Sequence, residues 1–288
     1  MPLPCKHAED ITEQVAPTIH LLRNMDALHP DILLQHNIHP EDYNGNLVFR
    51  SAVESIRGTY ISSSTTSRQG LIQRVLAQMK LSGLIADFQE TSSRSRYDFQ
   101  VTVAQNPDYF ASIEVKGGEG NSINISKRPI WAKEFAVWCH LDGAIVNQPA
   151  HGAGAIVNRL MRELVIEAKQ VDALFIRDVI CGTNLRPCPK YPEREDRVGD
   201  GTAPDVFLLP QRRPTLSDPE PPAHTLDTLR LPSLILTQFG ITGDKIPRHV
   251  WQVSVKIEEV SPGTFRRMSS VHHMGRVVMQ RTSRSWRD

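Results

Sequence analysis

The stretch YDFQVTVAQNPDYFASIEVKGG, from Tyr97 to Gly118, contains the pattern that decides the fold. Residues 97–103 and 110–116 each carry apolar side chains at every second position, and a turn at residues 106–108 separates the two runs. Alternation with a period of two is typical of a strand with one buried face. The stretch therefore predicts a β-hairpin.

Three ionisable side chains fall on one side of this hairpin. When it is folded about Pro107, Asp98 lies opposite Lys116, and Glu114 lies one diagonal step away. The alternation independently places Glu114 and Lys116 on the same face of their strand. A shift of the register by one residue would separate the three groups. We expect them to converge at one end of the ribbon.

Two carboxylates and a lysine at such a position suit a metal-assisted hydrolysis. Carboxylates a few ångströms apart repel each other, and a divalent cation between them removes the repulsion. Mg²⁺ held in this way also binds a phosphate oxygen and lowers the pKa of a bound water. A neighbouring lysine can stabilise the negative charge that develops during attack on phosphorus. The set therefore points to cleavage of phosphodiester bonds.

An acid followed, after a spacer, by Asp or Glu, any residue and Lys on adjacent strands resembles the PD-(D/E)XK nuclease superfamily. The matching residues are Asp98 and the run Glu114-Val115-Lys116, within a segment from Arg68 to Asn147. The resemblance implies an α-β-β-β-α-β core and one or two Mg²⁺ per active site. It also implies that Asp98, Glu114 and the backbone carbonyl of Val115 bind the metal and that Lys116 is catalytic.

The sequence departs from the family pattern in two places. Tyr97 replaces the proline before the first acid, and the acid that many members carry on the first helix is absent there. That helix offers Gln69 and Gln73 instead, and Glu54 lies outside it. The alternative interpretation of the acid-lysine set is a cross-strand salt bridge on an exposed ribbon, which stabilises by under about 1 kcal/mol.

Around the hairpin the pattern predicts helices alternating with strands. The expected helices cover residues 68–80, a segment starting near Pro129 with Trp131, Phe135 and Trp138, and residues 155–169. The expected strands are residues 84–88, 97–103, 110–116, 144–146 and 173–180. This order predicts the α/β class, with a mixed central β-sheet flanked by helices.

The chain divides into three segments by composition. Residues 1–60 predict a helical and irregular extension, and residues 61–181 the nuclease core. Residues 182–288 are expected to supply loops for recognition and dimerisation and to pack on the core as one domain. In this last segment a proline-rich stretch, 182–231, holds a possible strand at 206–209. A C-terminal β-hairpin is predicted from residues 249–260 and 276–280, turning at 261–263.

The overall composition fits a cytoplasmic, prokaryotic-type protein that is neither secreted nor inserted in a membrane. The net charge is +1 over 288 residues, and no apolar run is long enough to span a bilayer. The four cysteines form no metal-binding pair and are expected to be free thiols. The basic residues are clustered, which favours contacts with phosphate. The candidates for binding DNA are Lys127, Arg128, Arg212, Arg213, Arg266 and Arg267.

Within the superfamily, a chain of this size without an ATPase motif resembles a type II restriction endonuclease. The resemblance implies a homodimer that cuts a specific sequence in double-stranded DNA. Two alternatives remain open: a structure-specific nuclease of DNA repair or recombination, and a DNA-binding protein of this fold that has lost catalysis.

Overall fold

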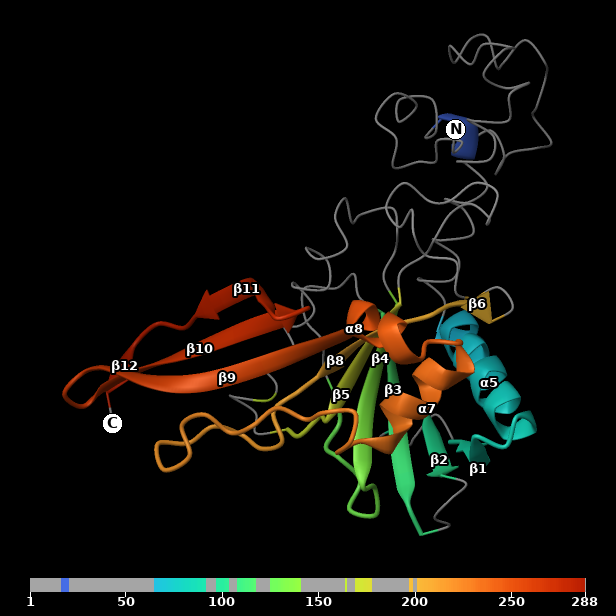
Figure 1. Ribbon diagram of the computed structural model, residues 1–288, viewed down its shortest axis with the longest axis horizontal. Helices are drawn as coiled ribbons and strands as arrows, with labels where there is room; N and C mark the ends of the chain where they lie inside the picture. The colour runs from blue at the N-terminus through green and yellow to red at the C-terminus, as the bar shows by residue number, and fades with distance from the viewer. Residues whose placement is uncertain are drawn as a thin grey trace.

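The computed structural model describes residues 17–20, 65–91, 97–103, 108–117, 125–140, 164, 169–177, 197–198 and 201–287. These residues form a ten-stranded mixed sheet in the order β1-β2-β3-β4-β5-β8-β9-β10-β11, with β12 paired to β10. The α/β class expected from the sequence is confirmed at this level. Figure 1 shows the sheet with α5 and α7 beside it.

The strands are β1 (Ile85–Glu90), β2 (Phe99–Val103), β3 (Phe110–Gly117), β4 (Glu134–His140), β5 (Ala173–Arg177), β8 (Asp205–Leu208), β9 (Val250–Ser261), β10 (Thr264–His273), β11 (Arg276–Thr282) and β12 (Trp286–Arg287). A separate two-stranded sheet pairs β6 (Arg197–Val198) with β7 (Gly201–Thr202). The helices are α5 (Thr65–Leu81), α7 (Arg230–Gln238), α8 (Ile246–His249) and the 3-10 turn η3 (Gly243–Lys245).

Helix α5 forms as its apolar periodicity predicts. Ile72, Leu76 and Met79 are fully buried on its inner face. The helix ends before Gly83, whose φ of +70° is a conformation that costs glycine little. The amide of Leu84 then donates to the carbonyl of Met79 and closes the last turn. The turn delivers the chain directly into β1, so α5 is placed against the hairpin that follows.

The hairpin of β2 and β3 forms, but its register differs from the prediction. Phe99 pairs with Ile113 and Thr102 with Phe110, so Asp98 stands next to Glu114 in the ladder and not opposite Lys116. The correction is a shift of two residues, which preserves the face of every side chain because strand side chains alternate with a period of two. The observed register places Asp98 level with Glu114 on the neighbouring strand.

The helix predicted to start near Pro129 is wrong, because its central residues form a strand. Residues 134–140 form β4, which runs parallel to β3 on one side and to β5 on the other. Phe135, Val137 and Cys139 are buried on one face, and Ala136 and Trp138 on the other. A strand buried on both faces reads as a continuous apolar run, which a helix also permits. The α-β-β-β-α-β order is consequently not reproduced between β3 and β4 by the described residues.

Several other predicted elements lie outside the described residues. The strand at 144–146 and most of the helix at 155–169 fall there, although Leu164 is helical and Lys169 is not. The predicted extension 1–60 is described only at residues 17–20, which are helical. The strands expected at 173–180 and 206–209 are confirmed as β5 and β8.

The C-terminal part of the chain continues the same sheet. Strand β8 is antiparallel to β5 and parallel to β9, so the region after the proline-rich stretch joins the centre of the sheet. The predicted hairpin is wrong in its pairing: β9 turns at Ser261 into β10, and β11 pairs with β10. These strands extend away from the rest of the sheet as a long ribbon (Figure 1). Helix α7, which has Pro232 in its first turn, was not predicted from the sequence.

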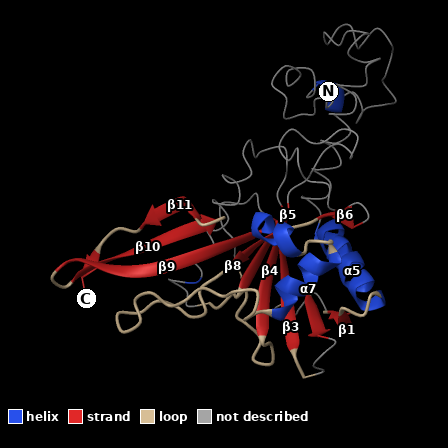
Figure 2. Cartoon of the chain, in the orientation of Figure 1, coloured by secondary structure: helices blue, strands red, loops and turns tan. Residues whose placement is uncertain are grey.

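The sheet separates two apolar layers. On one face, α5 and α7 pack over β2, β3, β4 and β5, as Figure 2 shows. On the opposite face a second cluster joins Phe135, Val137 and Cys139 with residues of β5, β9 and β10. We call this second side the β9 face. Directly paired residues of parallel strands point to the same side, so Glu114 and Lys116, paired with Val137 and Cys139, lie on the β9 face.

Two smaller expectations can be compared with the structure. No helix among the described residues combines the length and apolar character needed to cross a membrane. Cys139, the cysteine that falls in this part of the chain, is buried and not disulfide-bonded, as expected.

Candidate active site

Glu114 and Lys116 occupy alternate positions of β3 and touch each other. The ammonium nitrogen of Lys116 lies 2.7 Å from Oε1 of Glu114, with 6% of the Glu114 side chain exposed and 29% of that of Lys116. This contact runs along one strand, so the cross-strand salt bridge on an exposed ribbon is not what forms. A carboxylate buried to this degree loses much of its hydration and needs partners. Lys116 supplies one of them.

Ser126 supplies the other partners of Glu114. Its backbone nitrogen donates to Oε2 at 2.9 Å, and its hydroxyl donates to Oε1 at 3.2 Å. Ser126 follows the stretch after β3, twelve positions along the chain, where sequence spacing gives no sign of this contact. Its two donors fix the orientation of the Glu114 carboxylate at the carboxyl end of β3.

Asp98 lies where β2 begins, and its side chain extends the ladder between β2 and β3. Its backbone nitrogen donates to the carbonyl of Ile113 at 2.9 Å. Its carboxylate oxygen Oδ2 accepts from the backbone nitrogen of Val115 at 2.7 Å. The carboxylate thus takes the place of the next backbone acceptor of β2. Asp98 and Glu114 therefore flank the same residue, Val115.

Gln69 on α5 completes the surroundings of Asp98. Its side-chain nitrogen donates to Oδ1 of Asp98 at 2.5 Å. Gln69 stands on the first helix, which is where the sequence offered a glutamine in place of an acid. The structure brings that glutamine to Asp98. Gln73, one turn later, is exposed on the same helix.

The backbone carbonyl of Val115 faces the same edge as Asp98. The N–H and C=O groups of one strand residue point to the same side, as they do when a hydrogen-bonded pair exchanges both bonds. The N–H of Val115 points at Asp98, so the carbonyl of Val115 also points to the β2 side of β3. This place lies just before Phe99, where β2 begins. The Val115 amide and carbonyl therefore face the edge where Asp98 lies, while the side chain of Glu114 stands on the β9 face.

Carboxylate and carbonyl oxygens are the kinds of ligand that Mg²⁺ takes. Among the described residues no group of three His, Cys, Asp or Glu side chains could hold a metal by themselves. Mg²⁺ does not require such a group, because it is bound through one or two carboxylates and keeps several waters. A carboxylate also has about four lone-pair positions on its two oxygens, so Asp98 and Glu114 retain acceptor capacity beside their present donors.

The six basic candidates from the sequence do not act as one group. Arg128 turns inward: it forms an ion pair with the buried Asp172 at 3.0 Å and donates to the carbonyl of Ala132 at 3.0 Å. Arg212 pairs with Asp218, and Arg266 with Glu258. The side chain of Lys127 is exposed, and the described contacts of Glu114 do not include it. Arg128 in particular has a structural use that its sequence position did not reveal.

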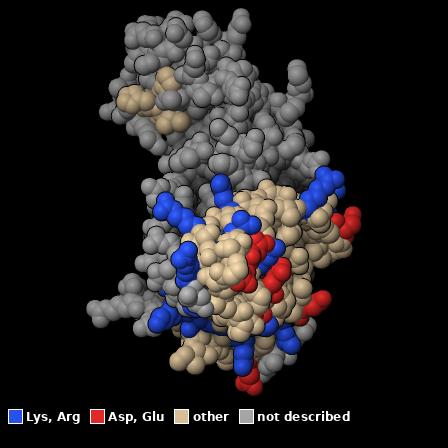
Figure 3. Space-filling view, turned by 90° about the vertical axis from the view of Figure 1, so that its left-hand side faces the viewer, with Lys and Arg blue, Asp and Glu red and all other residues tan. Residues whose placement is uncertain are grey.

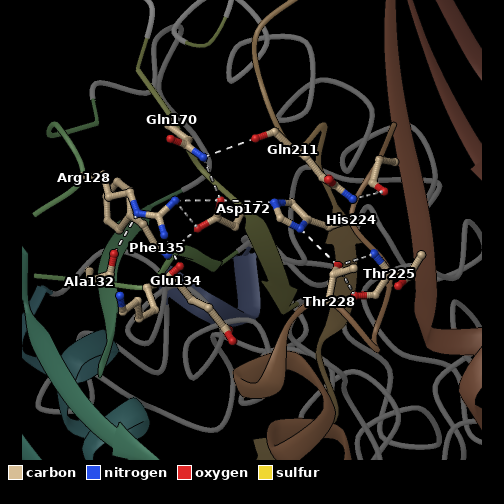
Figure 4. A network of polar contacts seen from close by, with 12 residues as sticks. Arg128, Ala132, Glu134, Phe135, Gln170, Asp172, Gln211, His224, Thr225 and Thr228 are labelled. Atoms are coloured by element: carbon tan, nitrogen blue, oxygen red, sulfur yellow. Dashed lines mark hydrogen bonds and ion pairs between the residues drawn. The ribbon is translucent and has the colours of Figure 1, made fainter. Parts of the chain in front are cut away.

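A buried polar network, shown in Figure 4, was missed by sequence reasoning. Asp172, just before β5, accepts from Arg128, from the backbone nitrogen of Phe135 and from Gln170, and lies 3.3 Å from Nε2 of His224. The network connects residues far apart in the sequence at the amino ends of β4 and β5. Glu114 pairs with Val137, three positions along β4 from Glu134, so this network lies on the amino-terminal side of Glu114.

Glu134, beside that network, anchors helix α7. Its carboxylate accepts from the backbone nitrogens of Arg230 at 2.5 Å and Leu231 at 3.0 Å, and from the hydroxyl of Tyr109 at 2.6 Å. Burial raises the pKa of Glu134, and these hydrogen bonds oppose the rise. Burial and the nearby Glu134 also raise the pKa of Tyr109. The role of Glu134 is to cap a helix.

Comparisons of this chain with models of protein families, with curated proteins and with solved structures gave no match.

Proposed function

We propose that this protein is a Mg²⁺-dependent endonuclease that hydrolyses phosphodiester bonds in double-stranded DNA, as a type II restriction endonuclease does. The observation that carries the proposal is the arrangement around Val115: the nearly buried Glu114 carboxylate in contact with Lys116, and Asp98 on the adjoining edge. Acid, acid and lysine thus belong to two paired strands, although the register that the sequence predicted was not correct.

In this proposal each residue has a distinct task. Asp98, Glu114 and the carbonyl of Val115 would hold Mg²⁺, which supplies polarisation of the phosphate and a bound water of lowered pKa. Lys116 holds its ammonium group within hydrogen-bond reach of the Glu114 carboxylate and so beside the expected position of the water. There it orients the water and stabilises negative charge on the phosphate oxygens. Ser126 and Gln69 position the carboxylates through their hydrogen bonds.

The buried state of Glu114 favours this role over a structural ion pair. An exposed ion pair adds little to the stability of the protein, and burying an ion pair costs the desolvation of both charges. Here the carboxylate is held by Ser126 and Lys116 while Lys116 remains partly accessible to solvent. A fixed acid beside an accessible ammonium group is the arrangement that a reacting phosphate needs.

The test is cleavage of plasmid and genomic DNA with Mg²⁺, with Ca²⁺ and without added metal. We expect discrete fragments with Mg²⁺, and binding without cleavage with Ca²⁺, whose geometry is looser. Asp98→Ala, Glu114→Ala and Lys116→Ala should each lower the rate by at least about a hundredfold while DNA binding persists. Asp87→Ala, which removes an exposed ion pair with Lys80, serves as the control.

Each outcome decides between the alternatives. Discrete bands at a palindrome, together with a dimer in analytical ultracentrifugation, support a restriction enzyme whose two-fold axis matches its site. Cleavage confined to branched or mismatched DNA indicates a repair nuclease. Binding without cleavage under every metal condition indicates a DNA-binding protein that has lost catalysis, and full activity of Glu114→Ala contradicts the assigned site.

A further inference from the structure

A pocket of about 150 Å³ opens on the β9 face, well away from Glu114. Lys169, Arg212 and Arg213 line it, together with Val255 of β9. Figure 3 looks onto the free end of the ribbon, and Lys and Arg side chains surround that end on several sides. The pocket thus brings together positive charges from two separate segments of the chain.

Arg267 of β10 lies beside the pocket's β9 wall without lining the pocket itself. It pairs with Ile257, two positions along β9 from Val255, so its side chain points to the same face as Val255. Its guanidinium stacks over the ring of Trp286 at 4.5 Å. The Nε atom of Arg267 is buried and has no hydrogen-bond partner among the described residues. A buried donor of this kind is costly unless a ligand satisfies it.

The charges of Arg213 and Arg267 are not balanced within the described part of the chain. Arg212 pairs with Asp218 at 2.6 Å, and Arg266 pairs with Glu258 on the other face of the ribbon. Neither Arg213 nor Arg267 takes part in an ion pair of the described residues. Burial lowers the pKa of Arg267, and the positive charge of Arg213 lowers it further. An anion bound beside these guanidinium groups would offset their positive charge.

We propose that this pocket binds a phosphate group through Arg213, with Lys169 and Arg212 at its rim and Arg267 beside its β9 wall. Arginine presents a planar fork that matches phosphate oxygens, and such charge-assisted hydrogen bonds are among the strongest in proteins. The identification of the phosphate as one of the DNA backbone rests on the proposed function. The pocket then holds the substrate at a point remote from the bond that is cut.

The sheet sets the separation of the two sites. Glu114 on β3 and Val255 on β9 lie on the same face, with β4, β5 and β8 between their strands. Neighbouring strands are about 4.8 Å apart, so the four steps span about 19 Å. Phosphates of one DNA strand follow each other at about 3.4 Å along the helix axis. A phosphate in the pocket is therefore several nucleotides from the one beside Glu114.

The experiment measures binding of the full chain to a labelled duplex in Ca²⁺, at several salt concentrations. Arg213→Ala and Arg267→Ala should each weaken binding by about tenfold and reduce the slope of log K against log salt by about 0.9. Arg267→Lys, which keeps the charge, should retain the slope. Lys80→Ala is the matched control, because it removes one exposed positive charge from α5, which packs on the opposite face of the sheet.

A second measurement separates the sources of phosphate. Inorganic phosphate should raise the melting temperature of the wild type and not that of Arg213→Ala. If phosphate does so while duplex binding and its slope are unchanged in both variants, the pocket binds free phosphate and the assignment to DNA is overturned. If neither duplex binding nor the phosphate effect changes, the phosphate site itself is overturned. Wild-type binding with this salt slope but without Mg²⁺-dependent cleavage contradicts the nuclease and leaves the pocket standing.

Discussion

The side-chain nitrogen of Gln69 on α5 lies 2.5 Å from Oδ1 of Asp98 at the start of β2. The contact joins the first helix to a carboxylate whose other oxygen is held by the backbone of Val115. Asp98 is therefore fixed from two sides, by a side chain from the helix layer and by the ladder of the sheet. Its environment depends on the packing of α5 as much as on the hairpin.

We predict that Gln69→Glu makes the site dependent on metal for its stability. A carboxylate at this position repels Asp98 without a cation and gains a shared cation when Mg²⁺ is present. The variant should melt at a lower temperature than wild type in EDTA and should be stabilised more by added Mg²⁺. Differential scanning fluorimetry across a Mg²⁺ titration measures both effects. Gln73→Glu, exposed one turn along α5, is the control, and an equal response of the two variants contradicts the prediction.

The buried Asp172 should matter to stability and not to cleavage chemistry. Asp172→Ala leaves Arg128 without its ion pair and the amide of Phe135 without its acceptor, inside the protein. Removing one member of a buried ion pair costs about 3–5 kcal/mol. Chemical denaturation should show a loss of this size. Arg212→Ala, which breaks an exposed pair, should cost under about 1 kcal/mol. Similar losses in both variants would show that Asp172 is not effectively buried.

Glu134 should give the protein a dependence of stability on pH. Burial raises the pKa of Glu134 in the folded protein above the ordinary value of a glutamate. The folded state then holds the proton more strongly than the unfolded state, so stability falls as pH rises through the interval between the two pKa values. Glu134→Gln removes this contribution. The difference in unfolding free energy between wild type and variant should therefore favour the wild type increasingly as the pH is lowered through that interval.

Removal of the Glu134 side chain separates capping from titration. Glu134→Ala leaves the amides of Arg230 and Leu231 at the start of α7 without an acceptor and should cost about 2 kcal/mol at neutral pH. Glu134→Gln keeps one acceptor oxygen and should cost less. Denaturant titrations of both variants at two pH values give the two effects. A Glu134→Ala variant as stable as wild type would contradict the capping role.

Local pattern was sufficient where polar and apolar side chains alternate, so that the two faces of an element differ in polarity. Helix α5, strands β1, β2 and β3 and the stop at Gly83 follow their apolar periods, so they were predicted within a few residues. The same patterns failed at β4, because its residues are buried on both faces and the run has no polar side to set its period. The spacing of Trp131, Phe135 and Trp138 then matched the period of a helix and led to the wrong prediction.

Pairing was harder to predict than the elements themselves. The sequence placed residues 250–261 in a strand but joined it to β11, whereas the intervening β10 is its partner. The polar residues of β10 conceal a strand that has one apolar position, Val271, in the β9-face cluster. Helix α7 was concealed by Pro232, which a helix accepts in its first turn.

The sequence by itself determined which side chains can take part in the proposed chemistry. Alternation in residues 97–103 and 110–116 puts Asp98, Glu114 and Lys116 at one end of a hairpin, and a register error of two residues leaves their faces unchanged. Only the tertiary structure decided what surrounds them. Ser126, Gln69 and the partners of Arg128 come from segments whose approach depends on how α5 and β5 pack on the sheet. Such contacts join residues distant along the chain, and no local period records them.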